Sequence, residues 1–171
     1  MGARDLNALL MRISQGDNAA FEELYVQTRR GVYSFLYSYF HNTADTEDAM
    51  QTTYLHVKRG ISSYRSGTNA RAWLLQIAKN VALNELKKKK REIPTEDVEL
   101  GAGEYTGTNT VTDFMEKVLS EEEQRIVTLH VLWKYKHREI GELLGCPTGT
   151  VTSKYKRAIE KLKKSLKEEI L

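Results

Sequence analysis

Hydrophobic residues recur every three to four positions along most of this chain, which is the spacing of one face of an α-helix. In the first half the pattern predicts a short helix over residues 5–14, a long helix over 18–40, a third after a break at 41–43, and a last long helix over 70–91. No stretch of any length alternates hydrophobic and polar residues as a half-buried strand does. The sequence therefore predicts an all-α fold.

Polar residues and glycines mark the breaks between these helices. Asp17 is a good N-cap for the long helix, and Asn42 is a cap candidate for the third. Residues 60–69 are rich in glycine and serine and are predicted to form a loop. In the third helix the predicted buried residues are Met50, Tyr54 and Val57, and the predicted outward residues are Asp48, Gln51, Thr52 and Leu55.

The second half carries shorter helical segments. Residues 111–118 predict one helix, and Ser120 with Glu123 forms a capping-box pattern that opens another. Residues 139–162 have the layout of a helix-turn-helix, because Gly-Cys-Pro at 145–147 supplies a helix stop and then a residue tolerated in a first helical turn. The inward residues predicted for its two helices are Ile140, Leu143, Leu144, Val151, Tyr155, Ala158, Ile159, Leu162 and Leu166.

The opposite side of the second helix in this motif is polar and basic. Its residues are Ser153, Lys156, Arg157, Glu160 and Lys164. Such a face suits a DNA major groove. A solvated surface helix is the alternative interpretation of this charge run. We favour DNA binding, because a surface helix alone needs no tight turn and no short, apolar-faced helix directly before it.

The net charge of +3 conceals an uneven distribution along the chain. Residues 1–91 contain 14 Lys and Arg against 8 Asp and Glu, residues 92–113 contain none against 6, and residues 114–171 contain 12 against 9. We interpret residues 92–112 as an acidic linker between one domain at 1–91 and another at 113–171. Two basic domains suit a polyanion, because the neutralisation of phosphates releases counterions.

Composition narrows the class of protein. The chain of 171 residues has 40% hydrophobic and 29% charged residues, as ordinary globular proteins do. The single Cys146 allows no internal disulfide, and no signal peptide or long apolar run is found, so we expect a cytoplasmic protein without membrane insertion. The four histidines are scattered, and we expect no metal or cofactor. No carboxylate cluster, histidine pair or phosphate-binding glycine loop supports an enzyme.

Five short motifs, one of them followed by a basic run, cover nearly the whole chain. They are DNAAFEELY at 17–25, TEDAMQ at 46–51, RAWLLQIAKN at 71–80 with the run KKKKR at 87–91, LSEEEQRIV at 119–127 and CPTGTVTSK at 146–154. Each is moderately specific alone. Together and in this order they resemble bacterial sigma factors of the sigma-70 family, and within it the compact extracytoplasmic-function (ECF) group.

The resemblance implies both a fold and a function. The N-terminal domain would be a four-helix domain of the sigma region 2 type, which engages the minus-ten promoter element and opens the duplex. The C-terminal domain would be a helix-turn-helix of the sigma region 4 type on the minus-thirty-five element. The protein would bind core RNA polymerase and promoter DNA, would do no bond-making itself, and would have an anti-sigma factor as a partner. Its acidic linker would enter the polymerase's RNA path.

Five residues with chemistry suited to nucleic acid fall on one narrow face of the predicted 70–91 helix, at i, i+7, i+11, i+14 and i+18. They are Trp73, Asn80, Asn84, Lys87 and Arg91. An aromatic ring, two amides and two cations can stack on, hydrogen-bond to and neutralise nucleic acid. The resemblance adds loop 60–69 as the pocket for a flipped-out base, with Tyr64 and Asn80 as its holders. The alternative to DNA contact is that Trp73 is simply a core residue. For Tyr64 the alternative is an aromatic residue packed within the loop. The predicted minus-ten residues are Gly60, Tyr64, Arg65, Trp73, Ile77, Asn80, Asn84, Lys87 and Arg91.

The resemblance also assigns residues of the helix-turn-helix. Base-reading positions fall on Thr152, Ser153, Lys156 and Arg157, and phosphate contacts on Thr150 and Lys154. Thr152 and Lys154 stand where arginine is common in the family. Lysine cannot make the planar, bidentate contact that arginine makes with guanine or phosphate, so we expect a distinct sequence preference at the minus-thirty-five element. Residues 134–138 replace a typical glycine-containing turn and serine cap, which predicts a poorly capped first helix and added phosphate contacts.

A polymerase-binding face is implied for the third helix. Its predicted residues are Asp45, Glu47, Asp48, Gln51, Thr52 and Leu55. Thr52 stands where an acidic residue is common, so we expect a weaker contact there. A plain solvated helix face is the alternative.

The main alternative function is a free-standing transcription regulator. In that case the N-terminal helices would dimerise or bind a ligand, and the helix-turn-helix would bind a palindromic operator without polymerase. Dependence of specific DNA binding on core polymerase separates the two functions.

Overall fold

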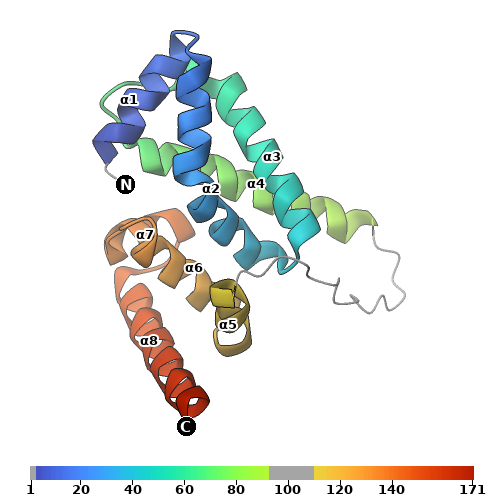
Figure 1. Cartoon of the computed structure of the whole chain (residues 1–171), viewed down its shortest axis with the longest axis vertical. Coiled ribbons are helices and arrows are strands. Elements are labelled where there is room, and N and C mark those ends of the chain that lie inside the picture. Colours follow the sequence, from blue (N-terminus) through green and yellow to red (C-terminus); the bar gives the residue numbers. More distant parts are fainter. Residues whose placement is uncertain (1–2, 93–109) are drawn as a thin grey trace. The chain divides into compact units, whose positions relative to one another are not determined.

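The computed structural model describes residues 3–92 and 110–171, and every regular element in these ranges is a helix (Figure 1). The chain divides into two compact units, one on either side of residues 93–109. The first contains α1 (Ala3–Ser14), α2 (Asn18–Phe40), α3 (Thr43–Gly60), the short 3-10 helix η1 (Ile61–Ser63) and α4 (Ala70–Glu92). The second contains α5 (Thr110–Val118), α6 (Glu121–Val131), α7 (His137–Leu144) and α8 (Thr148–Ile170).

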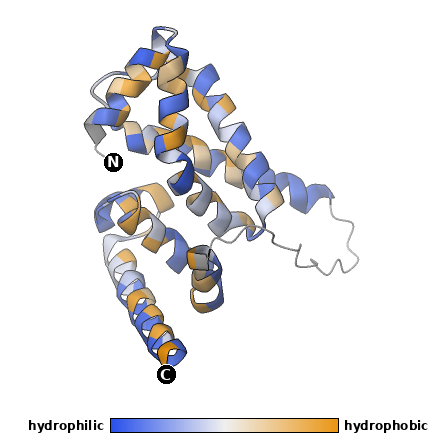
Figure 2. Cartoon of the chain, viewed as in Figure 1, coloured by the Kyte–Doolittle hydropathy of each residue, from blue (hydrophilic) through white to orange (hydrophobic). Residues whose placement is uncertain are grey.

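Helix α2 packs against α1, α3 and α4, so it forms the centre of the first unit. All four helices contribute hydrophobic side chains to one core, including Leu6, Leu10, Leu24, Phe35, Leu36, Val57, Leu74 and Leu75. In Figure 2 the C-terminal end of α4 is hydrophilic, in contrast to the part of the helix that carries the core residues. The core requires the helical spacing seen in the sequence, and the predicted all-α fold is confirmed.

The predicted helix breaks of the first unit are confirmed by their caps. The Asp17 carboxylate accepts the backbone N–H of Ala20 at 3.1 Å and so caps α2. The Asn42 side chain accepts the backbone N–H of Asp45 at 2.9 Å and caps α3. Both caps satisfy backbone donors that a helix leaves without partners at its start.

The buried side of α3 differs in part from the prediction. Tyr54 and Val57 are buried, but Met50 is only half-buried and Ala49 lies in the core instead. The Tyr54 hydroxyl lies 2.7 Å from the Thr28 hydroxyl, so its polar end has a partner inside the unit. Burial raises the pKa of Tyr54.

Helix α8 packs against α5, α6 and α7, so it organises the second unit. The unit's core includes Ile126, Leu129, Ile140, Val151 and Ala158. The predicted apolar stripe of α8 ends early: Leu162 is half-buried, and Leu166 is 47% exposed. At 23 residues α8 is about twice as long as its neighbour α6, at 11, so its last turns extend past the core.

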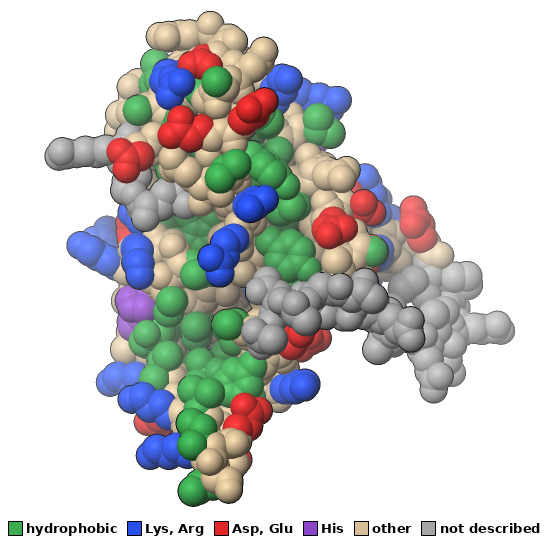
Figure 3. Space-filling model, viewed as in Figure 1, with side chains coloured by type: hydrophobic (Ala, Val, Ile, Leu, Met, Phe, Trp, Pro, Cys, Tyr) green, Lys and Arg blue, Asp and Glu red, His purple; other side chains and the backbone are tan. Residues whose placement is uncertain are grey.

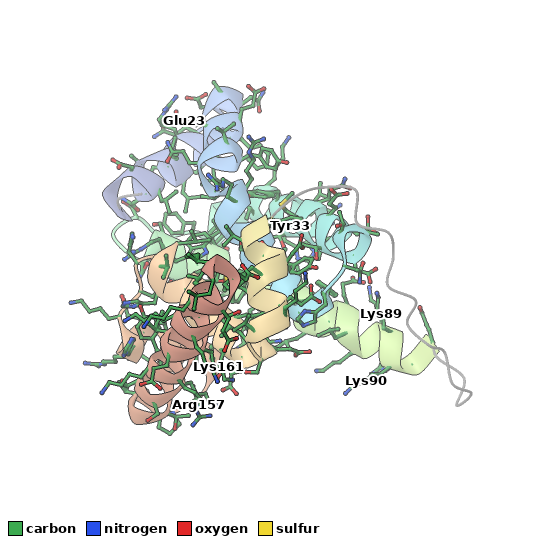
Figure 4. The ribbon with its side chains drawn as sticks, turned by 60° about the horizontal axis from the view of Figure 1, so that its bottom comes forward. Glu23, Tyr33, Lys89, Lys90, Arg157 and Lys161 are labelled. Atoms are coloured by element: carbon green, nitrogen blue, oxygen red, sulfur yellow. The ribbon has the colours of Figure 1, made fainter. Side chains whose placement is uncertain are left out.

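The predicted capping box at the start of α6 is confirmed. The Ser120 hydroxyl accepts the Glu123 N–H at 3.3 Å, and the Glu123 carboxylate accepts the Ser120 N–H at 3.0 Å. Lys161 of α8, labelled in Figure 4, also donates to Glu123 of α6 at 2.8 Å. This bond links α6 to α8. Although desolvation opposes the effect, hydrogen bonds from Lys161 and the Ser120 N–H hold the pKa of Glu123 below its usual value.

The predicted linker lies almost wholly outside the described residues. Its two ends are exceptions, because α4 extends to Glu92 and α5 begins at Thr110. The expectation that the linker enters the polymerase's RNA path therefore stays a prediction. In the described residues, no helix has both the length and the apolar character to cross a membrane.

Candidate nucleic-acid interface

The turn between α7 and α8 is held by close backbone contacts. Gly145 has a φ of 71°, which favours glycine, and the Cys146 N–H donates to the Gly141 carbonyl at 3.0 Å. A Cβ atom on Gly141 would lie 2.6 Å from the Cys146 carbonyl oxygen. Pro147 is the N-cap of α8 and lies just before its first turn. The predicted helix-turn-helix is confirmed, and Gly141 is a requirement that the sequence pattern did not reveal.

The start of α7 is capped differently from the prediction. Lys136 is the N-cap and provides no side-chain acceptor, but its backbone N–H donates to the Glu139 carboxylate at 2.8 Å. This is one half of a capping box, so the helix start is better satisfied than expected. Lys134 just before it has a φ of 57°, a conformation that lysine seldom adopts.

The outward side of α8 is exposed as predicted. Ser153, Lys156 and Arg157 are exposed, and Thr150 is half-buried. Lysine and arginine side chains line one edge of the second unit in Figure 3, and Figure 4 shows Arg157 projecting from α8. These groups offer hydroxyl, ammonium and guanidinium donors along one helix, which is the chemistry needed to contact base edges and phosphates.

Two of the predicted DNA-contacting residues are already engaged. The Thr152 hydroxyl donates to the Thr148 carbonyl at 3.1 Å and lies 2.9 Å from His137 Nδ1. Lys154 forms an ion pair with Glu122 of α6. Both contacts fix side chains at the edge of the outward face, so Lys154 can reach a phosphate only by exchanging one anion for another.

Three rings cluster where α6, α7 and α8 meet. His137 lies with its ring centre 5.0 Å from that of His130 and 5.1 Å from that of Tyr155, and His130 and Tyr155 are 4.6 Å apart. Desolvation, and secondarily the charge of His130, lower the pKa of His137. This cluster could not be predicted from the local sequence pattern, because its members are seven and 18 positions apart on different helices. Among the described residues, no group of three or more His, Cys, Asp or Glu is placed to hold a metal ion.

The second candidate surface lies on α4. Asn80, Asn84, Lys87 and Arg91 are exposed along it, as the spacing predicted. The Asn80 amide oxygen accepts from Gln76 at 3.0 Å, a bond at the surface that DNA can replace. At the C-terminal end of the same helix lie Lys89 and Lys90 (Figure 4). Ile77 is half-buried and Arg65 exposed.

The two aromatic residues assigned to this surface pack against each other. The rings of Tyr64 and Trp73 have centres 5.2 Å apart, and Tyr64 is 7% exposed while Trp73 is half-buried. Gly60 lies beneath Trp73, since a Cβ there would be 3.7 Å from the indole. The Tyr64 hydroxyl donates to the Asn7 side chain of α1 at 2.6 Å. In this conformation Tyr64 supports the loop, and loop 60–69 meets solvent through its other residues.

A basic groove of about 410 Å³ separates the outward sides of α3 and α4. Its lining residues are Thr52, His56, Val81, Asn84, Glu85, Lys87, Lys88 and Arg91. Three cations against one carboxylate suit the groove to an anion. Its lining includes Asn84, Lys87 and Arg91, which were expected to contact DNA, and also Thr52, which was expected to contact polymerase.

A second groove, of about 520 Å³, lies between α2 and α3. Its lining residues are Phe21, Tyr25, Glu47, Met50, Gln51, Tyr54, Leu55 and Lys58. Three residues of the predicted polymerase face therefore border an aromatic-lined hollow, and Leu55 is 52% exposed there. Asp48 is also exposed, and Thr52 is half-buried.

Asp45 is the member of the predicted polymerase face that is least available. Its carboxylate accepts from Asn42 at 2.7 Å and forms an ion pair with Lys89 of α4. Desolvation opposes the effect, but the hydrogen bonds from Lys89 and Asn42 lower the pKa of Asp45. The carboxylate therefore bridges α3 and α4 and is occupied by Lys89 and Asn42.

Both units match known family models. Residues 24–92 match the model for sigma-70 region 2, and residues 117–162 match the model for sigma-70 region 4. The chain belongs to the sigma-70 family of RNA polymerase sigma factors.

Relatives of similar length define the group within that family. The chain is 30% identical over 178 residues to the ECF RNA polymerase sigma-E factor of Haemophilus influenzae, covering 93% of this chain and 94% of the relative. It is 30% identical to the ECF RNA polymerase sigma-E factor of Escherichia coli K12, covering 89% of each chain. It is 24% identical to the RNA polymerase sigma-H factor of Pseudomonas aeruginosa, covering 92% of each. The protein is an ECF sigma factor.

Solved structures share the fold. The sigma factor RpoE of Bartonella quintana, solved with the anti-sigma factor NepR, has a TM-score of 0.65 and 22% identity, covering 86% of this chain and 96% of its own. CnrH, solved with the cytosolic domain of CnrY, has a TM-score of 0.64 and 17% identity, covering 96% and 98%.

Proposed function

We propose that the two exposed polar and basic helix faces, on α8 and on α4, are the two promoter-reading surfaces of this sigma factor. The observation that carries the proposal is that each face belongs to a separate unit and each unit has a core of its own. A face whose helix is already fixed by packing on its opposite side loses little conformational entropy when it binds. Two such faces can bind two promoter elements in one encounter.

In the second unit, α8 enters the major groove of the minus-thirty-five element. Ser153, Lys156 and Arg157 read base edges, while Thr150 and the first turn of α8 contact phosphate. That first turn contains no acidic residue and its N-cap has no side-chain hydrogen bond, so its backbone N–H groups can face an anion. Thr152 orients α8 against α7 through His137 and contributes less to base reading. Lys154 joins the phosphate contacts after leaving Glu122.

In the first unit, α4 and loop 60–69 engage the minus-ten element and promote strand opening. Asn80 and Asn84 hydrogen-bond to the separated strand, and Lys87 and Arg91 neutralise its phosphates. The basic groove beside α3 adds Lys88 to this anionic contact. Tyr64 and Trp73 form a packed support under the base pocket and help to keep it preformed.

Core RNA polymerase binds the outward side of α3. The exposed Glu47, Asp48, Gln51 and Leu55 provide charge, amide and apolar contacts beside the groove between α2 and α3. An apolar hollow with a polar rim has the usual composition of a protein interface. Asp45 contributes less, because it holds Lys89. The protein initiates transcription as a polymerase subunit, acts in the cytoplasm, and makes or breaks no bonds itself.

An anti-sigma factor is a further proposed partner. RpoE of Bartonella quintana was solved with such a factor. In this chain the side chains of Leu132 and Leu166 are exposed on the second unit, as Leu55 is on the first, and a protein partner can cover them.

A mobility-shift assay with and without core polymerase tests this function. We expect weak, salt-sensitive DNA binding by the protein alone and specific binding at both promoter elements only with core polymerase. Tight binding to a palindromic site by the protein alone would instead favour a free-standing regulator.

A further inference from the structure

The side chain of Asn7, on α1, holds loop 60–69 at two points. Its Oδ1 atom accepts the Tyr64 hydroxyl at 2.6 Å and the Gly67 backbone N–H at 3.4 Å. The first distance is that of a good O–H···O hydrogen bond, and the second is a longer contact. These bonds link α1 to a loop nearly 60 positions away in the sequence, so only the tertiary fold creates them.

The chemistry of the donors fixes which way the amide faces. The Gly67 N–H can only donate, so the atom facing it is the amide oxygen. The Tyr64 hydroxyl then donates to the same oxygen, and its other neighbour, the Thr68 carbonyl, is more distant at 3.4 Å. Gly67 has a φ of 82°, so the loop turns through a glycine conformation where Asn7 holds it.

Asn7 ties the middle of the loop to α1, whereas the loop's other hydrogen bonds, such as those from Thr68 to the Arg65 carbonyl, are local. Tyr64 is packed on Trp73, but residues 65–69 are exposed and have no hydrophobic core around them. A nearly buried phenol hydroxyl without a good partner is unfavourable, so loss of Asn7 would favour loop conformations in which Tyr64 turns outward. One side chain therefore contacts both the Tyr64 hydroxyl and the turn at Gly67.

We propose that Asn7 is a positioning residue for promoter opening, which keeps loop 60–69 in the shape that receives the flipped-out base. The inference rests on the proposed function of this loop. Flipping a base costs unstacking free energy, and a pocket that is already formed offsets that cost without a further ordering step. Asn7 acts through Tyr64 and Gly67 and is not itself a base-contacting residue.

The test compares Asn7→Ala and Asn7→Asp in the full chain bound to core polymerase, on one promoter, by time-resolved permanganate footprinting. Alanine removes the acceptor, and we expect about a five- to tenfold slower opening, the loss typical of one hydrogen bond, with unchanged closed-complex affinity. Aspartate keeps an acceptor for both donors and should restore opening. A template already unpaired over the minus-ten element should remove the difference between the variants.

Controls separate the possible failures. Asn18→Ala, at an exposed position on α2, should open the promoter normally. Tyr64→Phe removes the hydroxyl that donates to Asn7 and should resemble Asn7→Ala, with a double variant no slower than either.

Normal opening by Asn7→Ala, while Asn80→Ala is slow, would overturn the inference and leave the base pocket intact. Normal opening by both would instead contradict the proposed pocket. An equal defect of Asn7→Ala on the unpaired template would indicate a general loss of structure and also overturn the inference.

Discussion

Among single residues, the side chains of α8 that we propose for DNA contact divide into exposed and engaged ones. Lys156 and Arg157 are exposed, whereas Thr152 and Lys154 already contact His137 and Glu122. The Lys154–Glu122 pair is partly exposed, and such pairs contribute little to stability, so exchange of Glu122 for a phosphate is energetically accessible. Under the proposed function, sequence specificity depends most on Arg157, because its guanidinium can form a planar, two-point contact with guanine.

Arg157→Ala should weaken promoter binding through the minus-thirty-five element by about 1 to 3 kcal/mol and relax its sequence preference. The measurement is holoenzyme affinity for a set of promoters that differ only in that element. Lys167→Ala, on an exposed and distant turn of α8, is the matched control. An equal loss on every sequence would assign Arg157 to phosphate and contradict base reading.

At the scale of elements, the α7–α8 turn determines how the recognition helix is presented. Gly141 is buried, and a Cβ atom there would lie only 2.6 Å from the Cys146 carbonyl oxygen. The two helices approach this closely only because position 141 has no side chain. Gly149 in the first turn of α8 differs, since nothing lies within 4 Å of its Cβ position.

Gly141→Ala should therefore lower the free energy of unfolding of the second unit by about 1 to 3 kcal/mol, the usual range for overpacking. Gly149→Ala should be neutral or stabilising by up to about 1 kcal/mol, because alanine favours helix. Chemical denaturation of the full chain, followed by circular dichroism, gives both values. Equal free energies of unfolding for the two variants would contradict this, because they would show that the α7–α8 turn accommodates a Cβ atom at position 141 without loss of stability.

The ring cluster of His130, His137 and Tyr155 predicts a pH dependence of stability. The pKa of His137 is lowered in the folded protein, so the unfolded chain binds the proton first as the pH falls. Stability is therefore full above the ordinary histidine value of about 6.5 and falls below it, until the folded pKa is passed. The melting temperature of the full chain should decrease between pH 7.5 and 5.5, and His137→Asn should show a smaller decrease. An identical decrease in the variant would exclude His137 as the cause.

The local sequence predicted the helices well, because their ends depend on neighbouring residues. Asp17, Asn42 and Ser120 cap helices from within three positions. The contacts that shape the candidate surfaces could not be predicted in this way. Lys154 meets Glu122 and Tyr64 meets Asn7 across 32 and 57 positions, and these meetings depend on how helices pack.

In the whole molecule, two units with separate cores each carry an exposed polar and basic helix face, which we propose binds DNA. Each face alone offers a few contacts, which gives weak binding at physiological salt. Binding through both faces on one polymerase makes the second contact intramolecular and so raises the effective affinity without any new contact. We therefore expect promoter recognition to belong to the assembled holoenzyme.

Run-off transcription with purified core polymerase on a library of promoter variants tests this claim most directly. We expect a transcript of defined length only when the protein is added, and we expect that transcript to be lost when either promoter element is replaced. Sequence-specific DNA binding by the protein without any transcript from core polymerase would contradict it.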